Sequence, residues 1–363
     1  MDNKKYLGVG LLFLIVVVAL GAFFYSSSLD NNQDSISNAT SIPDVNSKTL
    51  KESEALETSS PISPVAIVSP LGSEANPTAI NPNTIQTMLE EAVQLQERGE
   101  FEEALVKTNQ IIELDPNNFF AFNIRGSVYL TLSEFDKAIE DYNKTLDLEP
   151  FFPHAFYNRG RAFRLKGQDE QALEDLQKSI DLSPTEFSYR AYGNIGLIHY
   201  KNKDYNKALV AFENSINNNT EDKADIYFFR GETYTALENF DAAISDYQAA
   251  IERFNNYAQA YQGLGFAYYK IGDIEEARQA IEKAVDISPD SSIAYFYLGL
   301  INLEGSQVDL AKENFSTATK TVDSLSAEDK DLIHERLSVE LERFAQENPN
   351  QSQNIEMLLE LLP

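Results

Sequence analysis

The fold of this 363-residue chain is decided by residues 258–291, which read AQAYQGLGFAYYKIGDIEEARQAIEKAVDISPDS. The small residues Gly265 and Ala277 stand at the eighth and twentieth places of this stretch, on what we expect to be two different helices. The bulky Tyr261 and Ile281 stand at the fourth and twenty-fourth places. Small residues let two helices approach closely, and bulky residues fill the space beside them. The stretch therefore predicts a tightly packed helix–turn–helix repeat.

The same pattern recurs along residues 85–325, in seven repeats. The repeats span 85–118, 119–152, 153–188, 189–223, 224–257, 258–291 and 292–325. The eighth place is always small: Ala92, Gly126, Gly160, Gly196, Gly231, Gly265 and Gly299. The twentieth place is always alanine: Ala104, Ala138, Ala172, Ala208, Ala243, Ala277 and Ala311. One repeat cannot bury its apolar face alone, so we expect the repeats to stack on one another.

This spacing resembles the tetratricopeptide repeat (TPR) family, and the resemblance covers all seven repeats. It implies an all-α fold, a right-handed superhelical solenoid of seven helix–turn–helix units. Four repeats close with a proline at the thirty-second place: Pro116, Pro150, Pro184 and Pro289. The third and fourth repeats run to 36 and 35 residues, which predicts slightly longer loops there. Gly99, Gly167 and Gly272 stand in the predicted turns, where glycine can adopt the left-handed conformation that ends a helix.

In TPR proteins the second, fifth, sixth, ninth, twelfth and thirteenth places of the first helix line a concave groove. Transferred residue by residue, this rule gives candidate peptide-binding residues: His154, Tyr157, Asn158, Arg161, Arg164, Arg190, Asn194, Tyr200, Lys201, Phe228, Phe229, Phe266, Tyr269, Phe296 and Tyr297. An acidic chain therefore gathers arginines and aromatic residues in the middle of its groove. Arginine can grip carboxylates and aromatic rings supply contact area, so an extended acidic or mixed peptide is the expected ligand.

An alternative stays open for these residues. The aromatic side chains can pack within the array, and the groove arginines can pair with nearby carboxylates such as Asp169, Glu170 or Asp225. Arginine at the seventh place of three repeats lies outside the groove positions, and we expect it to brace neighbouring helices. These seventh-place arginines are Arg125, Arg159 and Arg230.

One TPR subclass binds the C-terminal carboxylate of Hsp70 and Hsp90 with lysine, arginine and asparagine at fixed places on three consecutive repeats. The corresponding residues here are Asn123, Ser127, Asn158, Arg190 and Asn194. Only Asn158 matches the pattern, so that carboxylate clamp is not expected to form.

Residues 7–25 read LGVGLLFLIVVVALGAFFY, without a charged residue. As a helix of about 1.5 Å per residue they match the ~30 Å hydrocarbon core of a bilayer, which predicts a signal-anchor or transmembrane helix within residues 1–25. Lys4 and Lys5 precede this segment, whereas acidic residues follow it. This asymmetry predicts a cytoplasmic N-terminus and an extracytoplasmic TPR domain, periplasmic in a bacterium. Cleavage after the serine run 26–28 is an open alternative.

Residues 26–84 are rich in Ser, Asn and Pro and are predicted to form a disordered tether. At the other end, Ile333, Leu337, Leu341 and Phe344 have the spacing of one helical face, which predicts a capping helix within residues 326–363. A short apolar helix follows, in residues 355–362. It is expected either to pack on the cap or to be presented to a partner or a second copy.

The chain has 57 acidic and 29 basic residues, a net charge of -28, which argues against nucleic-acid binding. It has no cysteine, and its three histidines are dispersed, His199 being the expected core residue among them. No phosphate loop, zinc signature or nucleophile motif occurs. We therefore expect no enzyme activity, no cofactor, no metal and no small-molecule substrate.

These observations lead to one hypothesis and one alternative. The hypothesis is a single-pass membrane-anchored scaffold that binds peptide segments of partner proteins in the TPR groove, in envelope assembly or protein export. The alternative is a general chaperone-like holding factor for exported proteins at the translocation channel.

Overall fold

The structure is a computed structural model that describes residues 82–218, 223–323, 341–342 and 344–346. The described chain forms two compact units, and the boundary between them falls between Ile195 and Gly196. All secondary structure of the described residues is helical, as expected for a TPR array. No helix of the described residues is both long enough and apolar enough to span a bilayer. The predicted membrane segment 7–25 lies outside the described residues.

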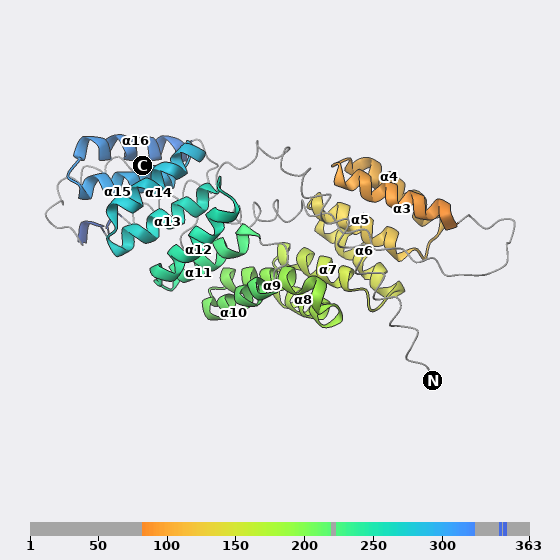
Figure 1. The fold of residues 1–363 in the computed structure, drawn as a ribbon. Helices are drawn as coiled ribbons and strands as arrows, with labels where there is room; N and C mark the ends of the chain where they lie inside the picture. Colours follow the sequence, from red (N-terminus) through yellow and green to blue (C-terminus); the bar gives the residue numbers. More distant parts are fainter. Residues whose placement is uncertain (1–81, 219–222, 324–340, 343, 347–363) are drawn as a thin grey trace. The chain divides into compact units, whose positions relative to one another are not determined.

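The first compact unit contains three helix pairs and the first part of α9. The pairs are α3 (Pro82–Glu97) with α4 (Phe101–Leu114), α5 (Phe119–Thr131) with α6 (Phe135–Leu148), and α7 (Pro153–Leu165) with α8 (Asp169–Leu182). Figure 1 shows each first helix beside its second helix. The first helix begins at Pro82, three residues before the predicted start of the first repeat, so part of the predicted tether is helical.

Helix α9 spans Pro184–Lys201 and crosses the boundary between the compact units. The second unit continues with α10 (Tyr205–Asn217), α11 (Ala224–Ala236), α12 (Phe240–Arg253), α13 (Ala258–Ile271), α14 (Ile274–Ile287), α15 (Ser292–Glu304) and α16 (Val308–Asp323). The prediction of a longer loop in the third repeat was wrong. The extra residues extend α9 instead, because Pro184 lacks an N–H and is well tolerated at the start of a helix.

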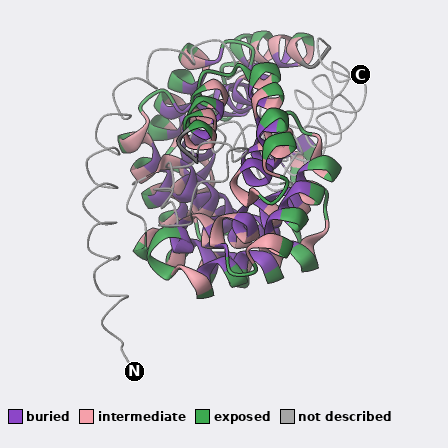
Figure 2. Cartoon of the chain, turned by 90° about the vertical axis from the view of Figure 1, so that its right-hand side faces the viewer, coloured by how far each residue is buried: buried purple, intermediate pink, exposed green. Residues whose placement is uncertain are grey.

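In the second to seventh repeats, the glycine at the eighth place faces the bulky residue at the twenty-fourth place. A Cβ placed on Gly126 would lie 2.9 Å from Cε1 of Tyr142, and one on Gly265 would lie 2.5 Å from Cγ1 of Ile281. Real Cβ atoms do not approach other atoms so closely, so only glycine fits these contacts. The prediction that the small residues let the two helices approach closely is thereby confirmed. Most helices carry one buried and one exposed face (Figure 2).

The turns within the repeats also follow the prediction. Gly99, Gly167 and Gly272 have φ angles of +74°, +74° and +89°, in the left-handed region. The other four repeats place a residue with a side chain at the same fifteenth place, and it adopts the same conformation. These residues are Ser133, Lys203, Glu238 and Ser306, with φ between +57° and +60°.

The end of the second compact unit is partly described. Leu341 and Phe344 are buried in one apolar cluster with residues of α15 and α16, such as Leu300 and Phe315. This agrees with a capping role for the predicted stripe. Ile333, Leu337 and the short run 355–362 lie outside the described residues.

Candidate functional site

The seventh-place arginines brace helices, as predicted. Arg125 donates from Nε and Nη2 to the two carboxylate oxygens of Asp141 on the next helix, at 2.8 and 2.6 Å. Its Nη1 donates to Oδ1 of Asn109, on α4 of the preceding repeat, at 2.6 Å. Burial raises the pKa of Asp141, and the hydrogen bonds from Arg125 act in the opposite direction. The same bonds raise the pKa of Arg125.

Two other repeats reproduce this arrangement. Arg159 binds both oxygens of Asp175, at 2.7 and 2.8 Å, and Arg230 binds both oxygens of Asp246, at 2.7 and 2.6 Å. Each of these carboxylates lies 16 residues after its arginine. A bidentate arginine–carboxylate pair combines charge with fixed geometry, so these arginines hold the two helices of a repeat together.

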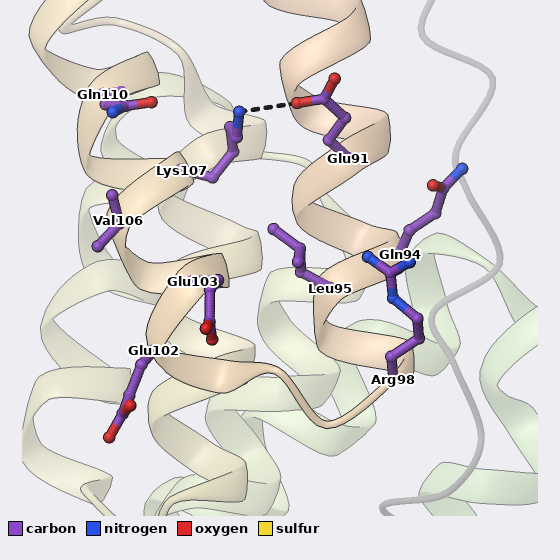
Figure 3. A pocket seen from close by; sticks show the side chains of 9 residues that line it. All are labelled: Glu91, Gln94, Leu95, Arg98, Glu102, Glu103, Val106, Lys107 and Gln110. Atoms are coloured by element: carbon purple, nitrogen blue, oxygen red, sulfur yellow. Dashed lines mark ion pairs between the residues drawn. The ribbon is translucent and has the colours of Figure 1, made fainter.

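The first repeat carries the same pair with the charges exchanged. Glu91 occupies the seventh place of α3, and Lys107 on α4 approaches it with Nζ 2.7 Å from Oε2. Sequence reasoning missed this pair, although its spacing of 16 residues was the available signal. The pair crosses a pocket of about 560 Å³ between α3 and α4 (Figure 3). The pocket is lined by Glu91, Gln94, Leu95, Arg98, Glu102, Glu103, Val106, Lys107 and Gln110.

This pocket is separate from the predicted groove residues. Gln94 stands at the tenth place of its repeat and is exposed, whereas Val128 and Ala162 at the same place of the next two repeats are fully buried. Within the described residues no repeat precedes α3. The pocket therefore marks the end face of the described array.

In the first compact unit, the predicted groove residues of α7 and α9 come together. Tyr157, Asn158, Arg161, Arg164 and Asn194 are all buried. The Nε of Arg164 donates to Oδ1 of Asn194 at 2.7 Å, which joins α7 to α9. The guanidinium of Arg161 lies over the ring of Tyr157, 5.7 Å from its centroid. Charged and amide groups are thus concentrated on one face of α7.

His154 and Arg190 lie at the edge of this group. His154 stacks on Phe152, with ring centroids 5.0 Å apart, and its Nε2 lies 3.3 Å from Oε1 of Glu186. Burial raises the pKa of Glu186, but the hydrogen bonds of His154 and Ser183 and the charges of His154 and Arg190 together hold it below its ordinary value. Arg190 donates from Nε to the hydroxyl of Tyr189. Glu186 was not among the carboxylates that the sequence suggested as partners for the groove residues.

Several buried polar atoms of the described residues make no hydrogen bond, and Oδ1 of Asn123 on α5 is one of them. Asn123, at the fifth place of α5, is 3% exposed, and its Oδ1 makes no hydrogen bond with the described residues. A buried amide oxygen without a donor is destabilising.

In the second compact unit, the predicted groove aromatics pack against one another. Phe228 lies against Phe229 and Tyr257, with centroids 5.2 and 4.9 Å apart. Phe266 lies 5.2 Å from Tyr297. The remaining aromatics of the set are placed similarly: Tyr200 beside Tyr205, Tyr269 beside Tyr297, and Phe296 beside Phe315. Lys201 is exposed at the end of α9. Packing is the role that these contacts show, and ligand binding by these residues stays a prediction.

The same unit contains a buried polar network. The hydroxyl of Tyr247 donates to Oε1 of Glu232 at 2.5 Å and lies 2.9 Å from Oγ1 of Thr235. Glu232 is 1% exposed, although it occupies the ninth, groove-lining place. Burial and the Glu232 carboxylate raise the pKa of Tyr247, so the hydroxyl keeps its proton and acts as a donor. No cluster of three metal-binding side chains occurs in the part of the chain that the structure describes.

Comparison with known proteins matches this geometry to a family. Sequence models of the tetratricopeptide repeat match residues 125–187, 189–222, 216–290 and 263–318. The chain belongs to the tetratricopeptide repeat family. This TPR chain is 29% identical over 138 residues to the TPR repeat-containing protein MJ1428 of Methanocaldococcus jannaschii, covering 38% of this chain and 24% of that protein. It is 27% identical over 110 residues to the heat shock protein STI1 of Saccharomyces cerevisiae, covering 30% and 18%.

These relatives share only part of their length with this chain, since the match spans about a quarter or less of each. Among solved structures, the Cut9–Hcn1 hetero-tetramer of APC/C aligns with a TM-score of 0.55 at 18% identity, covering 71% of this chain and 50% of that chain. At this identity the likeness concerns the fold alone. It agrees with an all-helical TPR array.

Proposed function

We propose that this chain is a protein-interaction scaffold that binds an extended segment of a partner protein on the groove face of α5, α7 and α9. TPR arrays mediate protein–protein interaction, which supplies the general class. The observation that carries the proposal is the concentration of Arg161, Arg164 and Asn194 where α7 meets α9. Guanidinium and amide groups match the carboxylates and main-chain groups of an extended peptide.

Photocrosslinking in cells tests this proposal. A photoreactive residue at Thr131, half-buried at the thirteenth place of α5, should capture a partner, whereas one at the exposed Glu140 on α6 should not. Arg164→Gln should weaken the capture from Thr131. Equal capture from both positions, or none from either, would overturn the groove proposal.

We also propose that the scaffold is anchored in a membrane through residues 7–25, with the TPR array on the extracytoplasmic side. The support is the 19-residue uncharged segment and the lysines before it. The full-length chain should stay in the membrane fraction after an alkaline wash, and a chain lacking residues 1–25 should not. Release of the full-length chain by the wash would contradict the anchor. If an added protease digests the TPR array only when it can reach the extracytoplasmic face of the membrane, the result would support the proposed orientation.

A second candidate function is a holding factor that meets many unfolded chains. The similarity to a protein named as a heat shock protein favours it. The same crosslinking experiment separates the two functions, because a scaffold yields one dominant adduct and a holding factor yields many. The unmatched carboxylate-clamp positions, among them Ser127 and Arg190, argue against a ligand of the Hsp70 or Hsp90 type.

A further inference from the structure

Four phenylalanines form an aromatic edge where the chain enters α5 and α7. Phe119 and Phe120 begin α5, and Phe151 and Phe152 directly precede α7. The ring centroids of Phe119 and Phe120 lie 5.2 and 5.7 Å from that of Phe152. Phe151 is 69% exposed, more than any other large apolar side chain of the described residues. The aromatic edge therefore keeps apolar surface in contact with water.

The chain enters the array beside this edge. Helix α3 begins at Pro82, and Ile85, three residues later, packs in the same apolar cluster as Phe120. Neighbouring helices lie about 8–10 Å apart, so the residues before Pro82 start about one helix spacing from the aromatic edge. Pro70 precedes Pro82 by 12 residues. Because an extended chain covers about 3.3 Å per residue, the segment that ends at Pro70 can reach the edge with slack.

The sequence of that segment suits an aromatic surface. Residues 61–70 read PISPVAIVSP, and residues 58–73 contain no charged residue. A polyproline II helix has three residues per turn, so in that conformation every third side chain shares one face. The residues at this spacing, here called the proline face, are Pro61, Pro64, Ile67 and Pro70. Aromatic surfaces are the surfaces on which polyproline II segments dock.

Charge and connectivity favour this segment over other occupants. The acidic Asp115 and Glu149 stand in the loops that carry the aromatic edge. They repel acidic segments, which are common in a chain of net charge -28, but not the uncharged residues 58–73. Attachment at Pro82 also gives the segment an effective concentration on the order of millimolar. A second copy or a partner would have to bind from a more dilute solution.

We propose that the aromatic edge is a docking surface for residues 61–70 of the same chain, which bind it as a polyproline II segment through the proline face. A proline-rich segment is already restricted to this conformation, so it loses little entropy when it docks. Docking shortens the freely extensible part of the predicted tether to residues 26–60. The inference does not depend on the groove function, because it concerns a different surface and a different ligand.

Disulfide trapping in the full-length chain tests this inference. The chain has no cysteine, so two introduced cysteines give one defined pair. The test pair, Ser69→Cys with Asn117→Cys, places one thiol beside Pro70 and the other two residues before Phe119. The control pair is Ser69→Cys with Arg98→Cys, because residue 98 is exposed at the far end of α3.

The two pairs differ only in the edge of the array that they probe. A helix of the length of α3 spans about 24 Å, so an undocked segment reaches both of its ends. Docking holds the segment at one end, and the intramolecular disulfide should form roughly tenfold faster in the test pair than in the control pair. Gel electrophoresis without reductant, at low protein concentration, follows both rates.

Two matched sets of substitutions locate the contact. Phe151→Ser should equalise the two rates, whereas Val106→Ser, which removes a 57% exposed side chain on α4, should preserve the preference. Ile67→Asp should also equalise the rates, whereas Val68→Asp adds the same charge one position off the proline face and should preserve it. Position 67 precedes the helical array, so Ile67→Asp decides the outcome if Phe151→Ser fails to fold.

Three results would overturn the inference. The first is an equal rate in the test and control pairs of the otherwise unchanged chain. The second is a preference for the test pair that survives Phe151→Ser or Ile67→Asp. The third is a disulfide that joins two copies and increases with protein concentration, which would assign the aromatic edge to a second copy instead.

Discussion

Single residues in the turns carry strain that glycine would relieve. Glu238 has a φ of +57°, in the region where a side chain costs roughly 1–2 kcal/mol. Three repeats use glycine at the same fifteenth place, for example Gly167. The repeats therefore share the same turn conformation. The residue at the fifteenth place determines how much conformational free energy the left-handed φ costs.

Replacing Glu238 with glycine should stabilise the chain. We expect Glu238→Gly to raise the free energy of unfolding by about 0.5–1 kcal/mol, because relief of the left-handed strain outweighs the added entropy of the unfolded chain. Denaturant unfolding followed by circular dichroism measures the change. Glu238→Ala is the control, since it removes the side chain without easing φ. Equal stability of the glycine and alanine variants would contradict the strain.

The pH dependence of stability should report on His199. It occupies the eleventh place, where Tyr129 and Phe163 stand in other repeats. Burial lowers the pKa of His199, as does Lys207, while Asp204 acts in the opposite direction. The unfolded chain therefore binds the proton more readily, and stability falls as pH drops below about 6.5 through the folded-state pKa.

The variant His199→Phe should flatten this dependence. Its denaturation midpoint is expected to change less than that of the wild type between about pH 7 and about pH 5, because the titrating group is gone. The comparison needs both proteins at each pH. If the stability of the wild type instead rises as the pH falls, and this rise is absent in the variant, then folding raises the pKa of His199 rather than lowering it.

At the scale of elements, helix pairs depend on the contact between the eighth and twenty-fourth places. A methyl group on Gly265 would lie 2.5 Å from Cγ1 of Ile281. Gly265→Ala should therefore destabilise the fold by about 1–3 kcal/mol, although alanine favours helix formation. Gly305→Ala is a matched control, because the nearest atoms there lie 3.6 Å away. Ile281→Val should partly rescue Gly265→Ala, and strictly additive effects in the double variant would argue against the contact.

The brace between helices should also be measurable. Arg159→Met leaves the buried Asp175 without its bidentate partner, and we expect a loss of about 1–3 kcal/mol in the free energy of unfolding. Asp175→Asn in the same chain should restore part of it, since the unpaired charge is removed. Lys137→Ala, which deletes an exposed ion pair with Glu134, should leave the free energy of unfolding nearly unchanged. Similar losses of stability in Arg159→Met and Lys137→Ala would show that the pair of Arg159 and Asp175 has no special role in joining the two helices.

At the scale of the whole molecule, the net charge of -28 opposes the compact state. Salt screens this repulsion, because the Debye length is about 10 Å at 0.1 M. The unfolding temperature of the full-length chain should therefore rise between about 0.02 and about 0.3 M sodium chloride. A neutral solute at the same osmolality is the control. A falling unfolding temperature would mean that ion pairs such as Arg125 with Asp141 outweigh the repulsion.

The sequence alone determined the repeat length, the helix–turn–helix unit and its internal packing. These features arise from contacts between residues about 16 apart, such as Gly126 with Tyr142, which any stacked copy of the unit must make. The left-handed turns at Ser133 and Glu238 were not predicted, because residues with a side chain rarely adopt this conformation, whereas a glycine such as Gly167 indicates it in the sequence. The reversed pair of Glu91 and Lys107 was likewise missed, because a different charge order gives the same contact.

Only the tertiary structure decided how neighbouring repeats share side chains. Arg164 and Asn194 are 30 residues apart, and their hydrogen bond depends on how α9 lies against α7. The early start of α9 at Pro184 has the same origin, since proline suits both a loop and the first turn of a helix. Contacts within a repeat follow from its spacing, whereas contacts between repeats depend on the angle and register with which each packs on the last.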